Sequence, residues 1–336
     1  FPSHLRFPTF FNRIPYRLIW HSLVLIYSFD SLSFIYKKHH IPLQTPTQSI
    51  ILSLSLSLSR FFTKTHIEMG IESERKKRYA LLLAARDSEY VMKVYGGYFN
   101  VFLAAFGEEE EEERWDLYRV VDGEFPDTNE LQAYDGFVVS GSPYDAYGDD
   151  TWILELCFLL QTLDCMQKKV LGICFGHQVL CRALGGKVGK SHSGWDIGLR
   201  KVKIVKDFSP CSFLESLHEM PPSLSIIECH QDEVWEVPTG AEVIAFSDKT
   251  GVEMFTIGTH ILGIQGHPEY TKDILNNLID RLLTQDSIET GLAEDARLKL
   301  EIAEPDRKCW QQICKAFLKG YGMHTPELKY EDIIFS

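Results

Sequence analysis

The sequence has no excess of basic residues. Among its 336 residues, 34 Lys and Arg stand against 47 Asp and Glu, and the net charge is −13. A protein that neutralises the phosphates of DNA or RNA needs a clustered surplus of positive charge, so we expect no nucleic-acid partner. The apolar run at residues 18–29 is interrupted by His21 and Ser22 and falls short of the roughly 20 residues of a spanning helix. We therefore expect no membrane partner either.

Methionine is absent before Met69, and cysteine is absent from the same stretch. Residues 1–68 hold seven Lys or Arg against two acids, and residues 52–59 alternate Leu and Ser as a translated CT repeat does. We predict that residues 1–68 are a disordered leader, an untranslated region carried into the reading frame. The alternative is a transit peptide, which is rich in Arg and Ser and poor in acids. Residues 69–336 are then expected to form one catalytic domain with a helical C-terminal tail from about residue 285.

Paired cysteines and cofactor motifs are also missing. The eight cysteines all follow Met69 without an evident disulfide framework or a signal peptide, which favours a reducing compartment. We expect the cytosol, or the plastid if the leader is a true transit peptide. Gly185-Gly186-Lys187 lacks the spacing of a phosphate loop, and no nicotinamide fingerprint is present. We therefore expect no cofactor.

Short apolar runs alternate with longer amphipathic stretches. The runs, which suit strands buried on both faces of a parallel sheet, are residues 79–85, 136–139, 170–174 and 261–265. The stretches with helical spacing are residues 90–106, 152–166, 177–184, 273–283 and 310–318. Residues 199–255 are richer in short β-like pieces. The pattern predicts an α/β fold, a doubly wound and mostly parallel sheet flanked by helices with an antiparallel β extension.

One strand runs directly into a helix through Gly172-Ile173-Cys174-Phe175-Gly176. Gly-x-Cys-x-Gly is the nucleophile-elbow pattern with Cys in place of Ser, and the glycines allow a tight, strained turn. Cys174 at a helix start is expected to have a lowered pKa. The backbone N–H of Phe175 would face a developing oxyanion.

Two other interpretations of this segment stay open. Cys174 could be an ordinary buried thiol, since cysteine is among the most buried residues. It could also bind a metal with His177 and Cys181, although zinc would need a fourth ligand. We expect no metal.

A candidate base lies far downstream, in Gly266-His267-Pro268-Glu269. The preceding strand ends at a glycine, so His267 is expected at the carboxyl end of the sheet, where ligands of open α/β sheets bind. In extended backbone, residues i and i+2 point to the same side, which would let Glu269 reach the imidazole. The predicted triad is Cys174, His267 and Glu269.

With Gly-Ile-Cys-Phe-Gly-His-Gln and Gly-Ile-Gln-Gly-His-Pro-Glu in this order, the sequence resembles the class I glutamine amidotransferase family, with a flavodoxin-like fold. It looks most similar to the small γ-glutamyl peptidases of plants, through residues 140–147 and 228–234. The resemblance implies that the backbone of Gly141 joins that of Phe175 in the oxyanion hole. It also implies a set of substrate-binding residues, namely Ser142, Gln178, Trp195, Asp196, His230, Gln231 and Asp232.

The resemblance further implies a cysteine-dependent hydrolase that cleaves the γ-glutamyl bond of glutathione or a glutathione S-conjugate through a γ-glutamyl thioester. The partner is then a small γ-glutamyl substrate. Because the family pattern and the helical tail use up the chain, no obligatory synthetase partner is expected. Two alternatives remain: a glutaminase subunit that supplies ammonia to a separate synthetase, and a non-catalytic regulatory binding protein.

Overall fold

The structure, a computed structural model, describes residues 76–108, 113–205 and 221–320. The predictions for residues 1–68 and for the end of the C-terminal tail lie outside these ranges. Within them, no helix is both long and apolar enough to cross a membrane.

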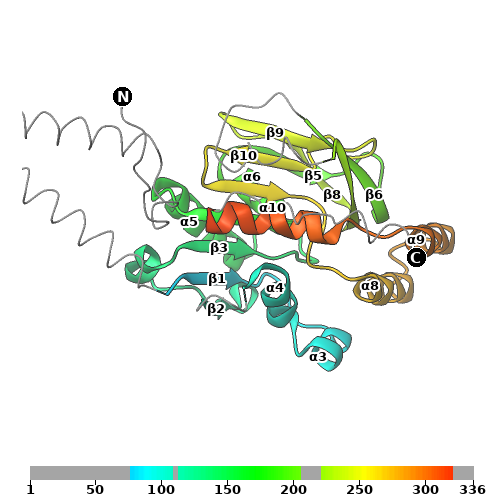
Figure 1. The fold of residues 1–336 in the computed structure, drawn as a ribbon, viewed down its shortest axis with the longest axis horizontal. Coiled ribbons are helices and arrows are strands. Elements are labelled where there is room, and N and C mark those ends of the chain that lie inside the picture. Colours follow the sequence, from blue (N-terminus) through cyan, green and yellow to red (C-terminus); the bar gives the residue numbers. More distant parts are fainter. Residues whose placement is uncertain (1–75, 109–112, 206–220, 321–336) are drawn as a thin grey trace, which may run out of the picture. The chain divides into compact units, whose positions relative to one another are not determined.

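A nine-stranded mixed sheet runs through the described chain in the order β2-β1-β3-β4-β11-β10-β9-β6-β7 (Figure 1). Its strands are β1 (Arg78–Leu82), β2 (Arg114–Tyr118), β3 (Gly136–Val139), β4 (Lys169–Ile173), β6 (Asp196–Ile204), β7 (Ser223–His230), β9 (Ala241–Phe246), β10 (Met254–Ile257) and β11 (Ile261–Ile264). The five strands from β2 to β11 pair in parallel, and the others pair antiparallel. The predicted fold class and its antiparallel extension are confirmed.

A separate two-stranded sheet pairs β5 (Lys187–Lys190) with β8 (Asp232–Glu236). The helices are α3 (Glu89–Tyr95), α4 (Tyr98–Phe106), α5 (Thr151–Cys165), α6 (Phe175–Ala183), α8 (Lys272–Thr284), α9 (Thr290–Ile302) and α10 (Arg307–Lys319).

The sequence predicted one helix over residues 90–106, and this prediction is wrong. Gly96 and Gly97 separate α3 from α4 with φ angles of 74° and 113°. These angles lie in the region that favours glycine, and Gly96 closes α3 as a left-handed cap. Glycine pairs are weak helix formers, so the Gly-Gly dipeptide carried the signal for this break.

Helices cover both faces of the parallel strands, and the alternation of side chains along each strand explains how. Tyr79 and Leu81 of β1 share a buried cluster with Phe102 of α4 and Phe317 of α10. Their neighbours on the same strand point the other way, because successive side chains alternate. Those neighbours join a second cluster with residues of α5 and α6. The helical C-terminal segment is therefore part of the core through α10.

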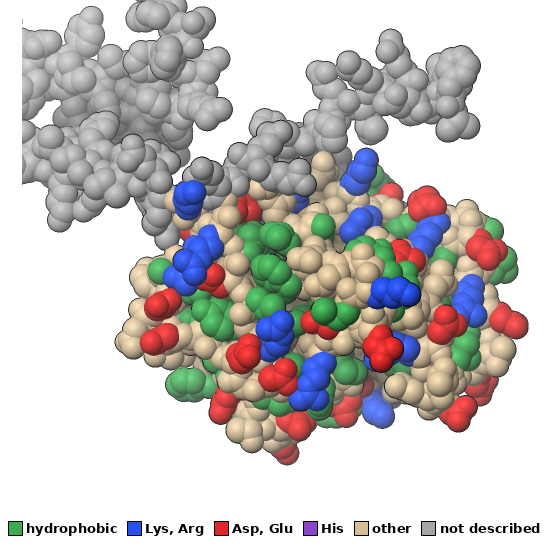
Figure 2. All heavy atoms as spheres, turned by 90° about the horizontal axis from the view of Figure 1, so that it is seen from below, with side chains coloured by type: hydrophobic (Ala, Val, Ile, Leu, Met, Phe, Trp, Pro, Cys, Tyr) green, Lys and Arg blue, Asp and Glu red, His purple; other side chains and the backbone are tan. Residues whose placement is uncertain are grey.

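A third buried cluster joins α8 and α9 to the antiparallel part of the sheet and to α3. Outside the core, Asp and Glu side chains are interspersed with Lys and Arg over the face of the molecule in Figure 2. The fold thus brings the carboxyl ends of β3, β4 and β11 together at one edge, with α4 and α8 nearby (Figure 1).

Candidate active site

Cys174 lies on a strained turn between β4 and α6. Its backbone has φ 53° and ψ −105°, although it is not a glycine. A Cβ atom on Gly172 would lie 2.4 Å from the carbonyl oxygen of Gly176, and one on Gly176 would lie 2.4 Å from that of Val139. Both glycines are required because real Cβ atoms do not approach backbone this closely. The tight turn that the Gly-x-Cys-x-Gly pattern predicted is confirmed.

The lowered pKa predicted for the Cys174 thiol is wrong. Burial raises the pKa of its thiol well above the ordinary value, and nearby acidic groups add to this rise. The hydrogen bond from the backbone N–H of Phe175 acts in the opposite direction and is the smaller effect. Only 6% of Cys174 is exposed, so desolvation outweighs the helix N-terminus. Because its pKa is raised, the thiol needs a base beside it to become a nucleophile.

His267 is held in one orientation by two neighbours. Its Nδ1 donates a hydrogen bond of 2.8 Å to Oε1 of Glu269, and both side chains are almost completely buried. The ring of Tyr270 stacks on the imidazole with centroids 3.9 Å apart and an interplanar angle of 2°. The carboxylate can only accept, so Nδ1 carries the proton and the lone pair is left on Nε2.

Glu269 reaches His267 by a different backbone path from the one predicted. Strand β11 ends at Ile264, and the chain turns at residues 267–270, where the N–H of Tyr270 donates to the carbonyl of His267 over 3.4 Å. The contact therefore arises in a turn and not in extended backbone. The predicted pair of side chains is nevertheless brought together.

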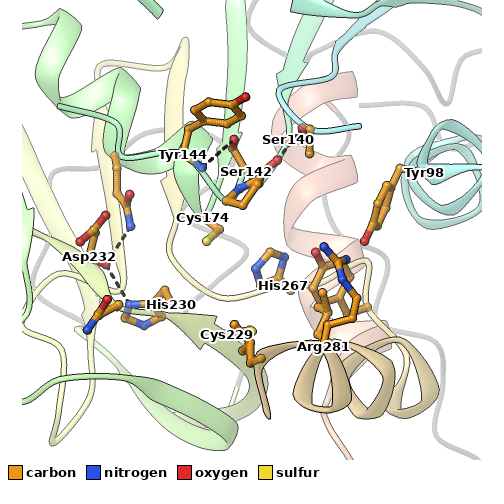
Figure 3. A pocket seen from close by; sticks show the side chains of 18 of the residues that line it. Tyr98, Ser140, Ser142, Tyr144, Cys174, Cys229, His230, Asp232, His267 and Arg281 are labelled. Atoms are coloured by element: carbon orange, nitrogen blue, oxygen red, sulfur yellow. Dashed lines mark hydrogen bonds between the residues drawn. The ribbon is translucent and has the colours of Figure 1, made fainter. Parts of the chain in front are cut away.

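Gly141 borders both Cys174 and His267. A Cβ atom placed on Gly141 would lie 3.6 Å from Cβ of Cys174 and 2.9 Å from Cε1 of His267. The backbone here is fixed by Ser140, whose hydroxyl accepts from the N–H of Ala84 at 2.8 Å and donates to the carbonyl of Gly141 at 2.9 Å. The three segments that carry the predicted nucleophile, base and oxyanion-hole glycine thus meet at one place (Figure 3).

A cavity of about 250 Å³ opens over Cys174 and His267. Ten of the predicted site residues line it: Gly141, Ser142, Cys174, Gln178, Trp195, His230, Gln231, Asp232, His267 and Glu269. Phe175 and Asp196 do not line it. Phe175 is buried and faces the site through its backbone N–H.

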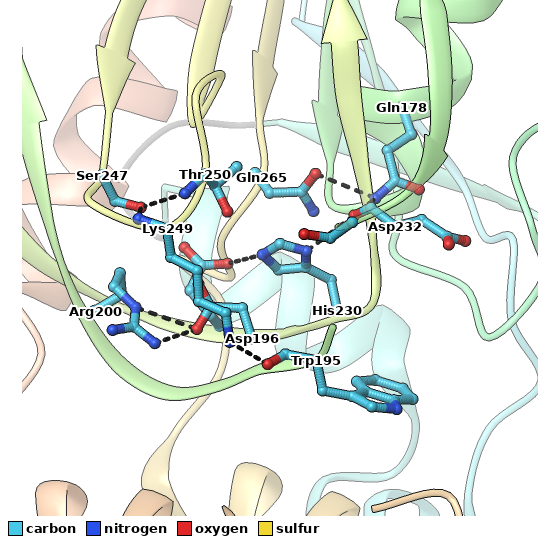
Figure 4. A network of polar contacts seen from close by, with 12 residues as sticks. Gln178, Trp195, Asp196, Arg200, His230, Asp232, Ser247, Lys249, Thr250 and Gln265 are labelled. Carbon is cyan, nitrogen blue, oxygen red and sulfur yellow. Dashed lines mark hydrogen bonds and ion pairs between the residues drawn. The ribbon is translucent and has the colours of Figure 1, made fainter. Parts of the chain in front are cut away.

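Asp196 belongs to a buried polar network and not to the cavity wall (Figure 4). Successive side chains of a strand point to opposite faces, so Trp195 reaches the cavity while Asp196, the first residue of β6, turns away. Its carboxylate pairs with Arg200. The prediction of Asp196 as a substrate-binding residue is therefore not supported by its position.

The polar end of the cavity is built around Asp232 and His230. The amide nitrogen of Gln178 donates to the backbone carbonyl of Asp232 at 2.8 Å and to Gln265 Oε1 at 3.1 Å. Burial lowers the pKa of His230 to about 4, so this imidazole is neutral. Burial, with the nearby charge of Asp145, raises the pKa of Asp232 to about 6.

The metal interpretation of Cys174, His177 and Cys181 finds no support in their surroundings. His177 packs on Phe255 with ring centroids 5.0 Å apart, and Cys181 Sγ donates to the carbonyl of Glu236 at 3.3 Å. Among the described residues, no group of three His, Cys, Asp or Glu side chains is placed to hold a metal ion.

Several residues of the site were not found from the sequence. Tyr270 stacks on the predicted base, and Tyr98 and Arg281 line the cavity from α4 and α8. Tyr270 follows Glu269 directly, so its proximity could have been expected. Tyr98 and Arg281 are distant in sequence from both motifs, and only the packing of their helices brings them in.

The sequence of this chain is similar to those of known proteins. The profile described as "Glutamine amidotransferase class-I" matches residues 116–280. "Gamma-glutamyl peptidase 3" of Arabidopsis thaliana is 55% identical over 247 residues, which cover 74% of this chain and 98% of that protein. "Gamma-glutamyl peptidase 5" of the same plant is 56% identical, over 73% of this chain and 96% of the relative.

Solved structures agree in fold. A glutamine amidotransferase from Thermotoga maritima aligns with a TM-score of 0.55 and 23% identity, covering 74% of this chain and 98% of that one. A glutamine amidotransferase from Methylobacillus flagellatus gives a TM-score of 0.55 at 18% identity, over 75% and 98%. At these identities the likeness concerns the fold alone.

Proposed function

Because the chain belongs to the class I glutamine amidotransferase family, alongside the γ-glutamyl peptidases, we propose that it uses Cys174 to hydrolyse the γ-glutamyl bond of glutathione or of a glutathione S-conjugate. Peptidase relatives that match over most of the chain support a γ-glutamyl hydrolase. The observation that carries the proposal is the meeting of the strained Cys174 turn with the His267–Glu269 pair in one cavity.

The first half of the reaction is acylation. Nε2 of His267 takes the proton of the neutral Cys174 thiol as the sulfur attacks the γ-carbonyl carbon. The backbone N–H groups of Gly141 and Phe175 stabilise the negative oxygen of the tetrahedral intermediate. His267 then gives its proton to the departing amine, and a γ-glutamyl thioester on Cys174 remains.

The second half is hydrolysis of the thioester. Nε2 of His267 takes a proton from water, and the resulting hydroxide attacks the thioester carbonyl. Glutamate leaves and the thiol is restored. Glu269 keeps Nδ1–H in place and stabilises the imidazolium that forms in each half.

The test is hydrolysis of glutathione and of an S-alkyl conjugate by the full chain, with both products identified by mass spectrometry. We expect glutamate and the matching cysteinylglycine, with the Cys174→Ala variant inactive. Cys165→Ala is the matched control, because Cys165 is an exposed free cysteine away from the cavity. Equal glutamate release by the parent and by Cys174→Ala would overturn the proposal. Ammonia release from glutamine without cleavage of glutathione would indicate a glutaminase instead.

A further inference from the structure

The cavity extends to both sides of Cys174 and His267 (Figure 3). On one side lie His230 and Asp232, and on the other lie Tyr98 of α4 and Arg281 of α8. We propose that the second side is the subsite for the leaving group, and that Arg281 there binds a carboxylate of the group that departs from the γ-glutamyl carbonyl. This assignment rests on the proposed γ-glutamyl peptidase function.

Arg281 belongs to one face of α8 that looks onto the cavity. The residues of α8 and of the chain just after it that line the cavity are Leu278, Arg281, Leu282 and Gln285. Their spacings of three, four and seven residues place them side by side on a helix. The face therefore offers one cation between two leucines, which suits a leaving group with both a carboxylate and an apolar substituent.

The guanidinium of Arg281 is free to bind a ligand. Its side chain makes no ion pair or hydrogen bond with any residue in the ranges that the structure describes. Arg86, the other basic residue lining the cavity, donates two hydrogen bonds of 2.9 and 2.7 Å to Asp122 and is already neutralised. Arg281 therefore offers an anion in the cavity a positive charge that no acidic side chain in the described part of the chain compensates.

The opposite side of the cavity disfavours such a carboxylate. Asp232 and Asp145 both line it there, and the pKa of Asp232 is raised to about 6 by burial and by its negative neighbour. Gln178 has its amide nitrogen engaged with Asp232 and Gln265, which leaves its oxygen as an acceptor. These groups suit the α-ammonium of the glutamyl moiety, which also carries an α-carboxylate and is neutral overall. The Cys-Gly end of glutathione has a carboxylate and no cation, so the substrate is oriented with this net negative leaving group toward Arg281.

Paired substrates test the assignment, because glutathione and glutathione amide differ in the terminal carboxylate alone. We expect Arg281→Gln to lower kcat/KM for glutathione about tenfold, mainly through KM, because a charge-assisted contact is lost. For glutathione amide the same variant should change kcat/KM less than about twofold. Arg281→Lys should recover part of the loss. Arg119→Gln is the matched control, because Arg119 is an exposed arginine that pairs with Glu124 outside the cavity, and it should affect both substrates equally little.

The outcomes separate the subsite from the function. An equal loss on glutathione and on its amide would overturn the assignment, since Arg281 would then act on the γ-glutamyl moiety or on the site as a whole. No loss on either substrate would overturn it as well, while the peptidase function would stand. Failure of the parent protein to cleave glutathione, its amide and an S-alkyl conjugate would overturn the proposed function and the subsite together.

Discussion

Two carboxyl groups, Glu228 and Glu253, are buried together behind the cavity. Both are at most 2% exposed, and Arg200, whose positive charge acts on both carboxyl groups, is hydrogen-bonded to Asp196. Burial raises the pKa of Glu253 from its ordinary value of 4.5 to about 7. The pKa of Glu228 is raised as well, first by burial and then by the charge of Glu253. We predict that ionisation of this pair limits the stability of the fold at alkaline pH.

The direction and size of the effect follow from linkage. The folded chain binds the proton of Glu253 more tightly than the unfolded chain does. The stabilisation from this proton is therefore fully present below pH 4.5 and is lost as the pH rises through about 7. At about 1.4 kcal/mol for each tenfold change in proton affinity, the full cost is about 3 kcal/mol. Glu253→Gln keeps the shape of the protonated side chain and cannot ionise. The difference in free energy of unfolding between the variant and the parent should therefore grow by about 2 to 3 kcal/mol from pH 5 to pH 8.

Urea denaturation of the parent and the variant at pH 5, 6.5 and 8, followed by circular dichroism, measures this gain. Burial also lowers the pKa values of His177 and His230, to about 3 and about 4, which weakens the fold at acid pH. That contribution is common to both proteins and cancels in their difference. Glu294→Gln, on the exposed surface of α9, is the matched control and should follow the parent. A gain for Glu253→Gln that is the same at all three pH values would show that ionisation of Glu253 does not limit the stability of the fold.

Two further substitutions test the geometry of the site. Gly176→Ala places a Cβ atom 2.4 Å from the carbonyl oxygen of Val139, so we expect a lower melting temperature and lost activity, whereas Gly251→Ala enters open space and should leave both unchanged. Glu269→Gln loses the carboxylate that holds the proton on Nδ1 of His267, and should lower kcat by about 10²-fold or more with a small change in KM. Unchanged melting for Gly176→Ala, or an unchanged kcat for Glu269→Gln, would contradict these contacts.

Local sequence was sufficient for the parts of the site that depend on neighbouring residues. The Gly-x-Cys-x-Gly turn is decided by contacts within five residues and the adjoining strand, and the His267–Glu269 contact joins residues two apart. His267 and Glu269 are in contact as predicted, although the backbone between them turns where an extended chain was expected. Buried apolar runs likewise predicted four of the five parallel strands, β1, β3, β4 and β11, because those strands are covered on both faces. The fifth, β2, has no fully buried residue and was not predicted.

The features that sequence analysis missed depend on long-range packing. The direction of the Asp196 side chain depends on the residue at which β6 begins. Because side chains alternate along a strand, Trp195 lines the cavity and the next residue, Asp196, points into the buried network. The raised pKa of Cys174 reflects its burial by segments remote in sequence, which a local rule about helix N-termini does not include. Arg281 reaches the cavity only because α8 packs beside β7.

In the proposed reaction, Cys174 carries the γ-glutamyl group during turnover. A single-turnover reaction of the full chain with glutathione, quenched in acid at successive times and digested for mass spectrometry, tests this most directly. We expect a glutamyl group on the peptide that contains Cys174, rising before free glutamate and decaying as glutamate accumulates. A glutamyl group on another residue, or glutamate formed without any adduct on Cys174, would contradict it.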